Sequence, residues 1–89
     1  MSQYFVQDPS EAIEYQLTWA SVLPNGVTIS TSEWEGAPLL LTDEALEDDF
    51  TAVLVKDGQR GKVYQVTNTV HLSNGEIYSN SIFITFEEK

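Results

Sequence analysis

The chain has 89 residues, a net charge of −10 and no cysteine. A single domain of this length buries about two-thirds of its extended surface, which allows one modest core but no deep catalytic cleft beside it. The missing cysteines exclude disulfide, zinc-thiolate and thiol chemistry, and the negative charge argues against a nucleic-acid partner, because phosphate binding needs a basic surface.

The N-terminal residues do not predict a signal for secretion or membrane insertion. Residues 1–6 lack a basic start and a long apolar stretch, so no secretory signal is expected. No apolar run reaches membrane-spanning length, so no membrane partner is expected either. The run Asp8-Pro9-Ser10-Glu11 combines an N-cap acid, proline at N1 and glutamate at N3, which predicts a single turn. We therefore expect residues 1–13 to form an N-terminal arm and turn.

The next segment alternates between apolar and polar residues, as a half-buried strand does. Tyr15, Leu17 and Trp19 fall on one face with a period of two. A second strand follows a Pro-Asn-Gly turn signal. Trp34 is out of phase with this second strand, and a bulge near Ser32-Glu33 would return it to the core.

The middle of the chain combines a short apolar run with a dense group of acids. Thr42 is expected to cap a brief helical turn that continues through Leu46. The five acids are Asp43, Glu44, Glu47, Asp48 and Asp49. They lack the residue order and the glycine of an EF-hand loop, so we expect an exposed connection and no metal site. The segment from Phe50 to Val55 is apolar on both faces, which predicts a central strand covered on both sides.

The last third of the chain, from Gly61 to Phe86, has the pattern of one long β-hairpin around Ser73-Asn74-Gly75. A two-residue turn would place the apolar residues of the two strands on opposite faces. A three-residue turn with Gly75 in a left-handed conformation pairs Leu72 with Glu76 and brings the apolar residues together, so we predict this register. In this register Asn68 lies opposite Asn80, and the two amides are expected to satisfy each other.

The core is predicted from the inward faces of these strands. Its expected members are Tyr15, Leu17, Trp19, Val27, Ile29, Leu54, Tyr64, Val66, Val70, Ile82 and Ile84. Many short strands separated by turn signals predict an all-β fold, a single immunoglobulin-like or fibronectin type III-like β-sandwich over residues 14–86, followed by a tail at 87–89. Tyr64 matches the tyrosine near the start of strand F in those folds, whose hydroxyl bonds back across the preceding loop.

The same register sends three apolar residues, Val63, Ile77 and Phe83, to the outer face of the hairpin, among threonines and serines. An aromatic residue is unexpected on a solvated face. One explanation is that Tyr4-Phe5-Val6 folds over Phe83. The alternative is that Phe83 anchors another protein chain and the arm extends across the same junction. Our candidate protein interface is therefore Tyr4, Phe5, Val6, Val63, Ile77 and Phe83.

Several stretches together resemble one protein family. They are residues 8–19, which run Asp-Pro-Ser-Glu-Ala-Ile-Glu-Tyr-Gln-Leu-Thr-Trp, then Trp34, Pro38-Leu39, residues 61–68 and the Ser73-Asn74-Gly75 turn. The pattern resembles small tailed-phage proteins described as fibre–tail adaptors or minor virion proteins. The chain departs from the family at Thr18, where an acid is expected before the tryptophan, and in its highly charged acidic stretch.

The resemblance implies a structural role in the virion, joining a tail component to fibres or other appendages after assembly in the host cytoplasm. The implied partners are other virion proteins, such as a tail adaptor, nozzle or fibre, and neighbouring copies of the chain. No cofactor is implied, and we expect no enzyme activity, because His71 is the single histidine and lies on the solvated face. The alternative function is a free-standing fibronectin-like module that binds a protein or glycan.

Overall fold

The protein is a β-sandwich of two sheets, in which most neighbouring strands run antiparallel. The computed structural model describes residues 3–88, and no helix is present among them. The strands are β1 (Gln3–Gln7), β2 (Ile13–Thr18), β3 (Ile29–Glu35), β4 (Leu40–Leu46), β5 (Phe50–Lys56), β6 (Val63–Leu72) and β7 (Ile77–Phe86). The prediction of an all-β sandwich is confirmed. No described element is a helix that is long and apolar enough to cross a membrane.

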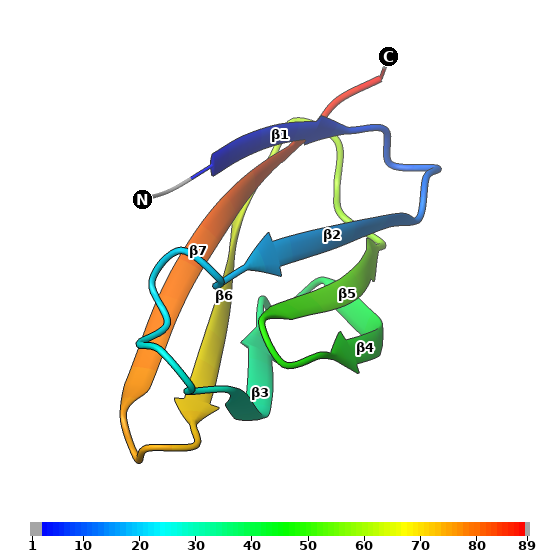
Figure 1. Cartoon of the computed structure of the whole chain (residues 1–89). Coiled ribbons are helices and arrows are strands. Elements are labelled where there is room, and N and C mark those ends of the chain that lie inside the picture. Colours follow the sequence, from blue (N-terminus) through cyan, green and yellow to red (C-terminus); the bar gives the residue numbers. More distant parts are fainter. Residues whose placement is uncertain (1–2, 89) are drawn as a thin grey trace.

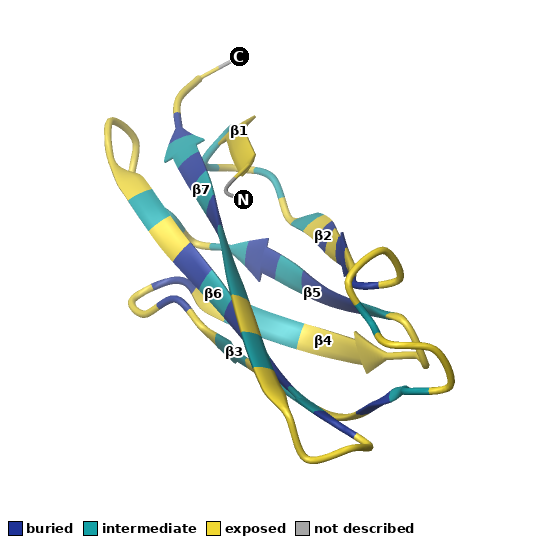
Figure 2. Cartoon of the chain, turned by 60° about the vertical axis from the view of Figure 1, so that its left-hand side comes forward, coloured by how far each residue is buried: buried dark blue, intermediate teal, exposed yellow. Residues whose placement is uncertain are grey.

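The two sheets differ in size and pack face to face (Figure 1). The larger sheet has the strand order β1-β7-β6-β3, and the smaller one has the order β2-β5-β4. Residues that alternate along β6 and β7 point into the space between the sheets, which gives the banded burial pattern of Figure 2. Phe86, Ile84 and Val53 are fully buried there. The core therefore lies between one long hairpin and the smaller sheet.

The predicted core is largely confirmed, with three members nearer the surface than expected. Val27, Leu54 and Tyr64 are only partly buried. Tyr64 still makes the predicted bond across the loop, because its hydroxyl accepts a hydrogen bond of 2.9 Å from the backbone N–H of Gln59. Its ring meets Phe86 edge-on at 5.5 Å. Tyr64 thus fixes the loop between β5 and β6 against the core.

The predicted hairpin register is confirmed. The N–H of Leu72 donates to the carbonyl of Glu76 at 2.8 Å, Val70 pairs with Tyr78, and Gly75 has a φ of 91°. Glycine adopts this left-handed conformation without the steric cost that a side chain would add. The turn length therefore decides which side chains of β7 face the core.

Asn68 and Asn80 lie opposite each other as expected, but the prediction that their amides bond to each other is wrong. The Oδ1 atom of Asn68 accepts hydrogen bonds from Thr51 Oγ1 at 2.6 Å and from Trp19 Nε1 at 3.3 Å. Its Nδ2 atom donates to Ser32 Oγ at 2.8 Å. Asn68 turns away because these partners from other elements satisfy both ends of its buried amide. The side chain therefore ties the two sheets together.

Two further predictions in the middle of the chain are wrong in detail. The bulge in β3 lies between Ile29 and Thr31, earlier than Ser32-Glu33. The segment from Thr42 to Leu46 is part of strand β4, with an irregularity between Thr42 and Ala45 in place of a helical turn. A helical turn this short gains little stability by itself, whereas pairing with β5 satisfies the backbone of the whole segment. In contrast, β5 is the central strand of its sheet, as predicted.

The segment expected as an N-terminal arm contributes a strand to the larger sheet. Strand β1 runs parallel to β7, with Gln3 opposite Ile82 and Gln7 opposite Phe86. The predicted turn follows it: Ser10 N–H donates to Asp8 Oδ1 at 2.8 Å, and Glu11 Oε1 accepts from Asp8 N–H at 2.8 Å. The bond from Asp8 N–H to Glu11 is the one that a capping box predicts, and the bond from Ser10 N–H to the Asp8 side chain is that of an Asx turn.

The end of β1 is held by the buried side chain of Gln7. Its Nε2 atom donates to the carbonyl of Val55 at 2.9 Å, and its Oε1 atom accepts from the Tyr15 hydroxyl at 3.0 Å. Burial, with a smaller contribution from the charge of Glu11, raises the pKa of Tyr15 to about 12. Tyr15 therefore stays a neutral donor at physiological pH, and Gln7 links β1 to the smaller sheet.

Candidate protein-interaction surface

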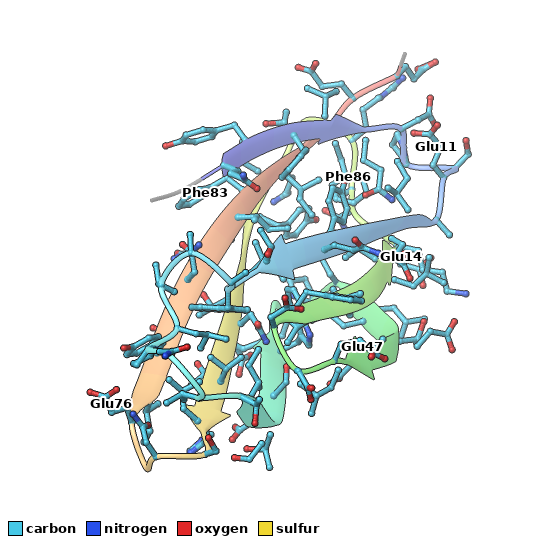
Figure 3. The ribbon with its side chains drawn as sticks, viewed as in Figure 1. Glu11, Glu14, Glu47, Glu76, Phe83 and Phe86 are labelled. Atoms are coloured by element: carbon cyan, nitrogen blue, oxygen red, sulfur yellow. The ribbon has the colours of Figure 1, made fainter. Side chains whose placement is uncertain are left out.

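The outer face of the larger sheet carries a group of exposed apolar side chains at one end. Strand pairing places Tyr4 beside Phe83, and both Val6 and Val63 beside Thr85. The rings of Tyr4 and Phe83 stack with centroids 5.2 Å apart and planes at 17°. We call Tyr4, Val6, Val63 and Phe83 the outer-face patch. Figure 3 shows Phe83 on β7 beside β1.

The patch is open to solvent and free of charge. Tyr4 is 77% exposed, Val63 is 60% exposed and Val6 is 50% exposed. Phe83 is half-buried because Tyr4 stacks on it. Exposed apolar residues that are scattered singly are normal, but a contiguous group that includes two stacked aromatic rings is typical of a contact surface.

Two of the six candidate residues lie elsewhere. Phe5 projects from the opposite face of β1, where its ring meets Tyr15 at 5.0 Å. Ile77 is exposed at the hairpin end of β7, opposite His71. Its six-residue separation from Phe83 corresponds to about 20 Å along a strand. The structure therefore gathers Tyr4, Val6, Val63 and Phe83 and separates Phe5 and Ile77 from them.

The position of the arm differs from both explanations considered for Phe83. Tyr4-Phe5-Val6 neither folds over the outer face nor extends away from the domain. It adds to the edge of the sheet beside β7, and Tyr4 covers only one side of the Phe83 ring. The extra strand is favoured because its backbone groups pair with the open edge of β7 while Gln7 is buried at its end. The patch consequently spans three strands.

Two ion pairs involve residues outside the patch. His71 Nε2 lies 3.4 Å from Glu33 Oε2, and both side chains are substantially exposed. The single histidine of the sequence thus lies on a solvated strand face, as predicted, and the structure adds Glu33 as its neighbour. Arg60 forms an ion pair with Glu88 near the end of β7.

The five acids of the middle segment are all exposed, but they do not share one connection. Asp43 and Glu44 lie on β4, where Asp43 has a φ of 53°. Glu47, Asp48 and Asp49 form the turn between β4 and β5. Within residues 3–88, no three acids or histidines are grouped so that they could hold a metal ion.

A second surface feature was missed by the sequence analysis. The connection between β2 and β3 lies against the hairpin half of β7 and leaves a hollow of about 510 Å³. It is lined by Thr18, Trp19, Ser21, Val22, Tyr78, Ser79 and Asn80. Trp19 and Tyr78 were assigned to apolar strand faces, and no local pattern indicates that a distant loop stands beside the edge of β7.

Comparison with known proteins assigns the chain to a family. A search of curated proteins finds no match. A family model described as "Podophage GP4 fiber-tail adaptor protein gp77" matches residues 7–85, which include six of the seven strands in full or nearly so and leave out Tyr4, Phe5 and Val6. Because the match covers most of the chain, this protein belongs to the podophage fibre-tail adaptor family.

Proposed function

We propose that the protein is a non-catalytic structural component of a phage virion that joins a tail component to the tail fibres or other appendages. The observation that carries this proposal is the family match over residues 7–85. The proposed partners are other virion proteins, such as a tail adaptor, nozzle or fibre, and neighbouring copies of the chain. Assembly takes place in the host cytoplasm. The 14–86 segment is the proposed domain, and β1 is an addition to its edge.

The outer-face patch is the proposed contact surface. Stacked aromatic side chains supply a large apolar area at low entropic cost, and residues of this kind contribute much of the binding energy at protein interfaces. Many copies around a ring would bind by avidity, so each contact can be small. The patch is suited to such a contact, since four uncharged side chains lie together on a chain whose net charge is −10.

The role is tested by locating the protein in intact particles with electron microscopy and crosslinking mass spectrometry. We expect it at the junction between tail and fibres. Its absence from that junction would contradict the proposed function.

The surface is tested by Val63→Thr, which keeps a β-branched side chain at a position that is 60% exposed. The matched control is Leu40→Thr, because Leu40 is an apolar side chain that is 42% exposed on β4 of the other sheet, away from the patch. We expect both variants to fold, and Val63→Thr alone to incorporate poorly into particles. Equal incorporation of the two variants would exclude the patch. These substitutions are sharper than Phe83→Thr, which also removes the stacking on Tyr4.

A further inference from the structure

The larger sheet has an edge that is only half covered. Strand β7 extends from Ile77 to Phe86, but β1 pairs only with the half from Ile82 to Phe86. Within the described part of the chain, Ile77–Ser81 has no strand partner on that side. In Figure 1 the hairpin half of β7 continues well beyond the first residues of β1.

The backbone groups of this stretch alternate between the two sides of β7. Before β7 the carbonyl of Glu76 accepts from the N–H of Leu72 on β6, and at the end of β7 the N–H of Phe86 donates to the carbonyl of Lys62, which precedes β6. Antiparallel pairing alternates, so even-numbered residues of β7 face β6 and odd-numbered residues face the opposite edge. The bond from Glu87 N–H to the Gln7 carbonyl, on the β1 side, agrees with this assignment.

Two odd-numbered residues therefore present free hydrogen-bonding groups at the uncovered edge. Ser81 is partly satisfied, because its N–H donates to Asn80 Oδ1 at 2.9 Å. Ile77 and Ser79 have no partner for their N–H and C=O groups on that side among the described residues, and both are exposed. A short row of donors and acceptors is thus available for one more strand.

The hollow described above adjoins the same edge. Its walls come from the connection after β2 and from Tyr78, Ser79 and Asn80, and none of the residues that line it is charged. Trp19 and Tyr78, which both line the hollow, have ring centroids 6.5 Å apart. A strand added beside Ser79 would direct alternate side chains to the two faces of the sheet. One of those side chains would enter the hollow.

Two other edges of the sandwich, those of β4 and β3, carry features that hinder strand addition. Strand β4 has an irregularity, the acids Asp43 and Glu44, and a positive φ at Asp43. Strand β3 contains a bulge and exposes Glu33 and Glu35. Bulges and charges are common protection against unwanted pairing. The stretch Ile77–Ser81 has neither a charged residue nor an irregularity.

We propose that Ile77–Ser81 and the adjoining hollow bind an extended strand of another virion protein, and that one apolar side chain of that strand lies between Trp19, Val22 and Tyr78. Main-chain bonds supply affinity and the hollow supplies specificity, as in other cases of strand addition to a sheet edge. The identity of the partner as a virion protein rests on the proposed function. A second copy is disfavoured as the occupant because each chain carries a net charge of −10.

The test uses phage particles assembled without this protein, to which the purified full chain is added. Ser79→Pro removes the outward N–H and places a ring at the edge, while the bonds to β6 remain, because proline is tolerated where the lost N–H faces solvent. Ser79→Thr is the matched control that keeps the N–H. We expect wild type and Ser79→Thr to bind equally, and Ser79→Pro to bind at least tenfold more weakly with a native circular dichroism spectrum. Binding of Ser79→Pro within twofold of wild type would overturn the proposal.

Two further measurements keep the result decisive if Ser79→Pro does not fold. Val22→Glu changes an exposed side chain at the hollow and is expected to weaken binding to the particles. Hydrogen exchange of a peptide covering residues 77–81 is expected to slow at least tenfold on particle binding, and unchanged exchange would contradict strand addition. If sedimentation shows that the wild type forms a dimer, and Val22→Glu abolishes this dimer, then a second copy of the chain occupies the site and the proposal is overturned. If wild type itself does not bind the particles, the proposed function fails; if it binds without these effects, only the edge site fails.

Discussion

Asn68 is a polar residue in the centre of the core, at a position of β6 whose neighbours Val66 and Val70 are fully buried. A buried amide is tolerated only when its donors and acceptors are paired. Asn68 meets this requirement through Thr51 on β5, Trp19 after β2 and Ser32 on β3. It therefore holds the two sheets in one relative position, which apolar contacts alone define less strictly.

We expect Asn68→Ala to lower the free energy of unfolding by about 2–3 kcal/mol, because it leaves buried polar groups without partners. The control is Asn80→Ala, since the Oδ1 atom of Asn80 accepts from the adjacent Ser81 N–H at the sheet edge. We expect Asn80→Ala to lower the free energy of unfolding by less than about 1 kcal/mol. Urea denaturation monitored by tryptophan fluorescence measures both values. Equal losses for the two variants would show that the network contributes no special stability.

At the level of elements, the loop between β5 and β6 passes directly over the core. A Cβ atom built on Gly58 would lie 2.3 Å from Cε1 of Phe86, whose side chain is fully buried. The neighbouring Tyr64 ring packs on Phe86, and its hydroxyl bonds to Gln59, so the loop is held close to Phe86. Gly58 is thus required by close packing of the loop on the end of β7.

Gly58→Ala is expected to destabilise the protein by about 1–3 kcal/mol, as overpacking of a filled core does. Combining it with Phe86→Leu should cost less than the sum of the two single changes, because the smaller side chain makes room for the added methyl group. Thermal or urea unfolding of all four proteins measures this coupling. Strict additivity would indicate that the loop shifts freely away from Phe86.

The pairing of the β6–β7 hairpin could be predicted from the sequence, whereas the strand conformation of β4 and the pairing of β1 with β7 could not. The register of β6 and β7 follows from the residues beside one turn, so it was predicted together with the outward positions of Val63 and Phe83. Residues 42–46 of β4 adopt a strand conformation because they pair with the edge of β5, and the local sequence does not show this pairing. The pairing of Gln3 with Ile82, which completes the outer-face patch, joins opposite ends of the chain and leaves no periodic signal.

Across the whole molecule, the acidic segment and the apolar patch belong to different layers. The exposed acids Asp43 and Glu44 lie on the smaller sheet, and Asp48 lies in the turn that follows β4. The patch lies on the outer face of the larger sheet. A partner that binds the patch therefore need not approach the strongest concentration of negative charge.

Millimolar calcium is expected to leave the melting temperature almost unchanged at constant ionic strength. The acids are exposed, and no suitable group of ligands is found within residues 3–88. A specific site would stabilise the native state by mass action. The measurement is a thermal melt with and without calcium, for wild type and for Asp48→Asn. A rise of several degrees that is absent in the variant would reveal a calcium site.

The parallel pairing of β1 with β7 also sets an order of events during folding. Closing a loop that includes nearly the whole chain between Gln3 and Ile82 costs more entropy than closing the short turn of the β6–β7 hairpin. The hairpin is therefore expected to form early, and β1 to join only after the edge of β7 exists. The same strand is expected to detach first under mild denaturant, with Gln7 as the last of its contacts to break.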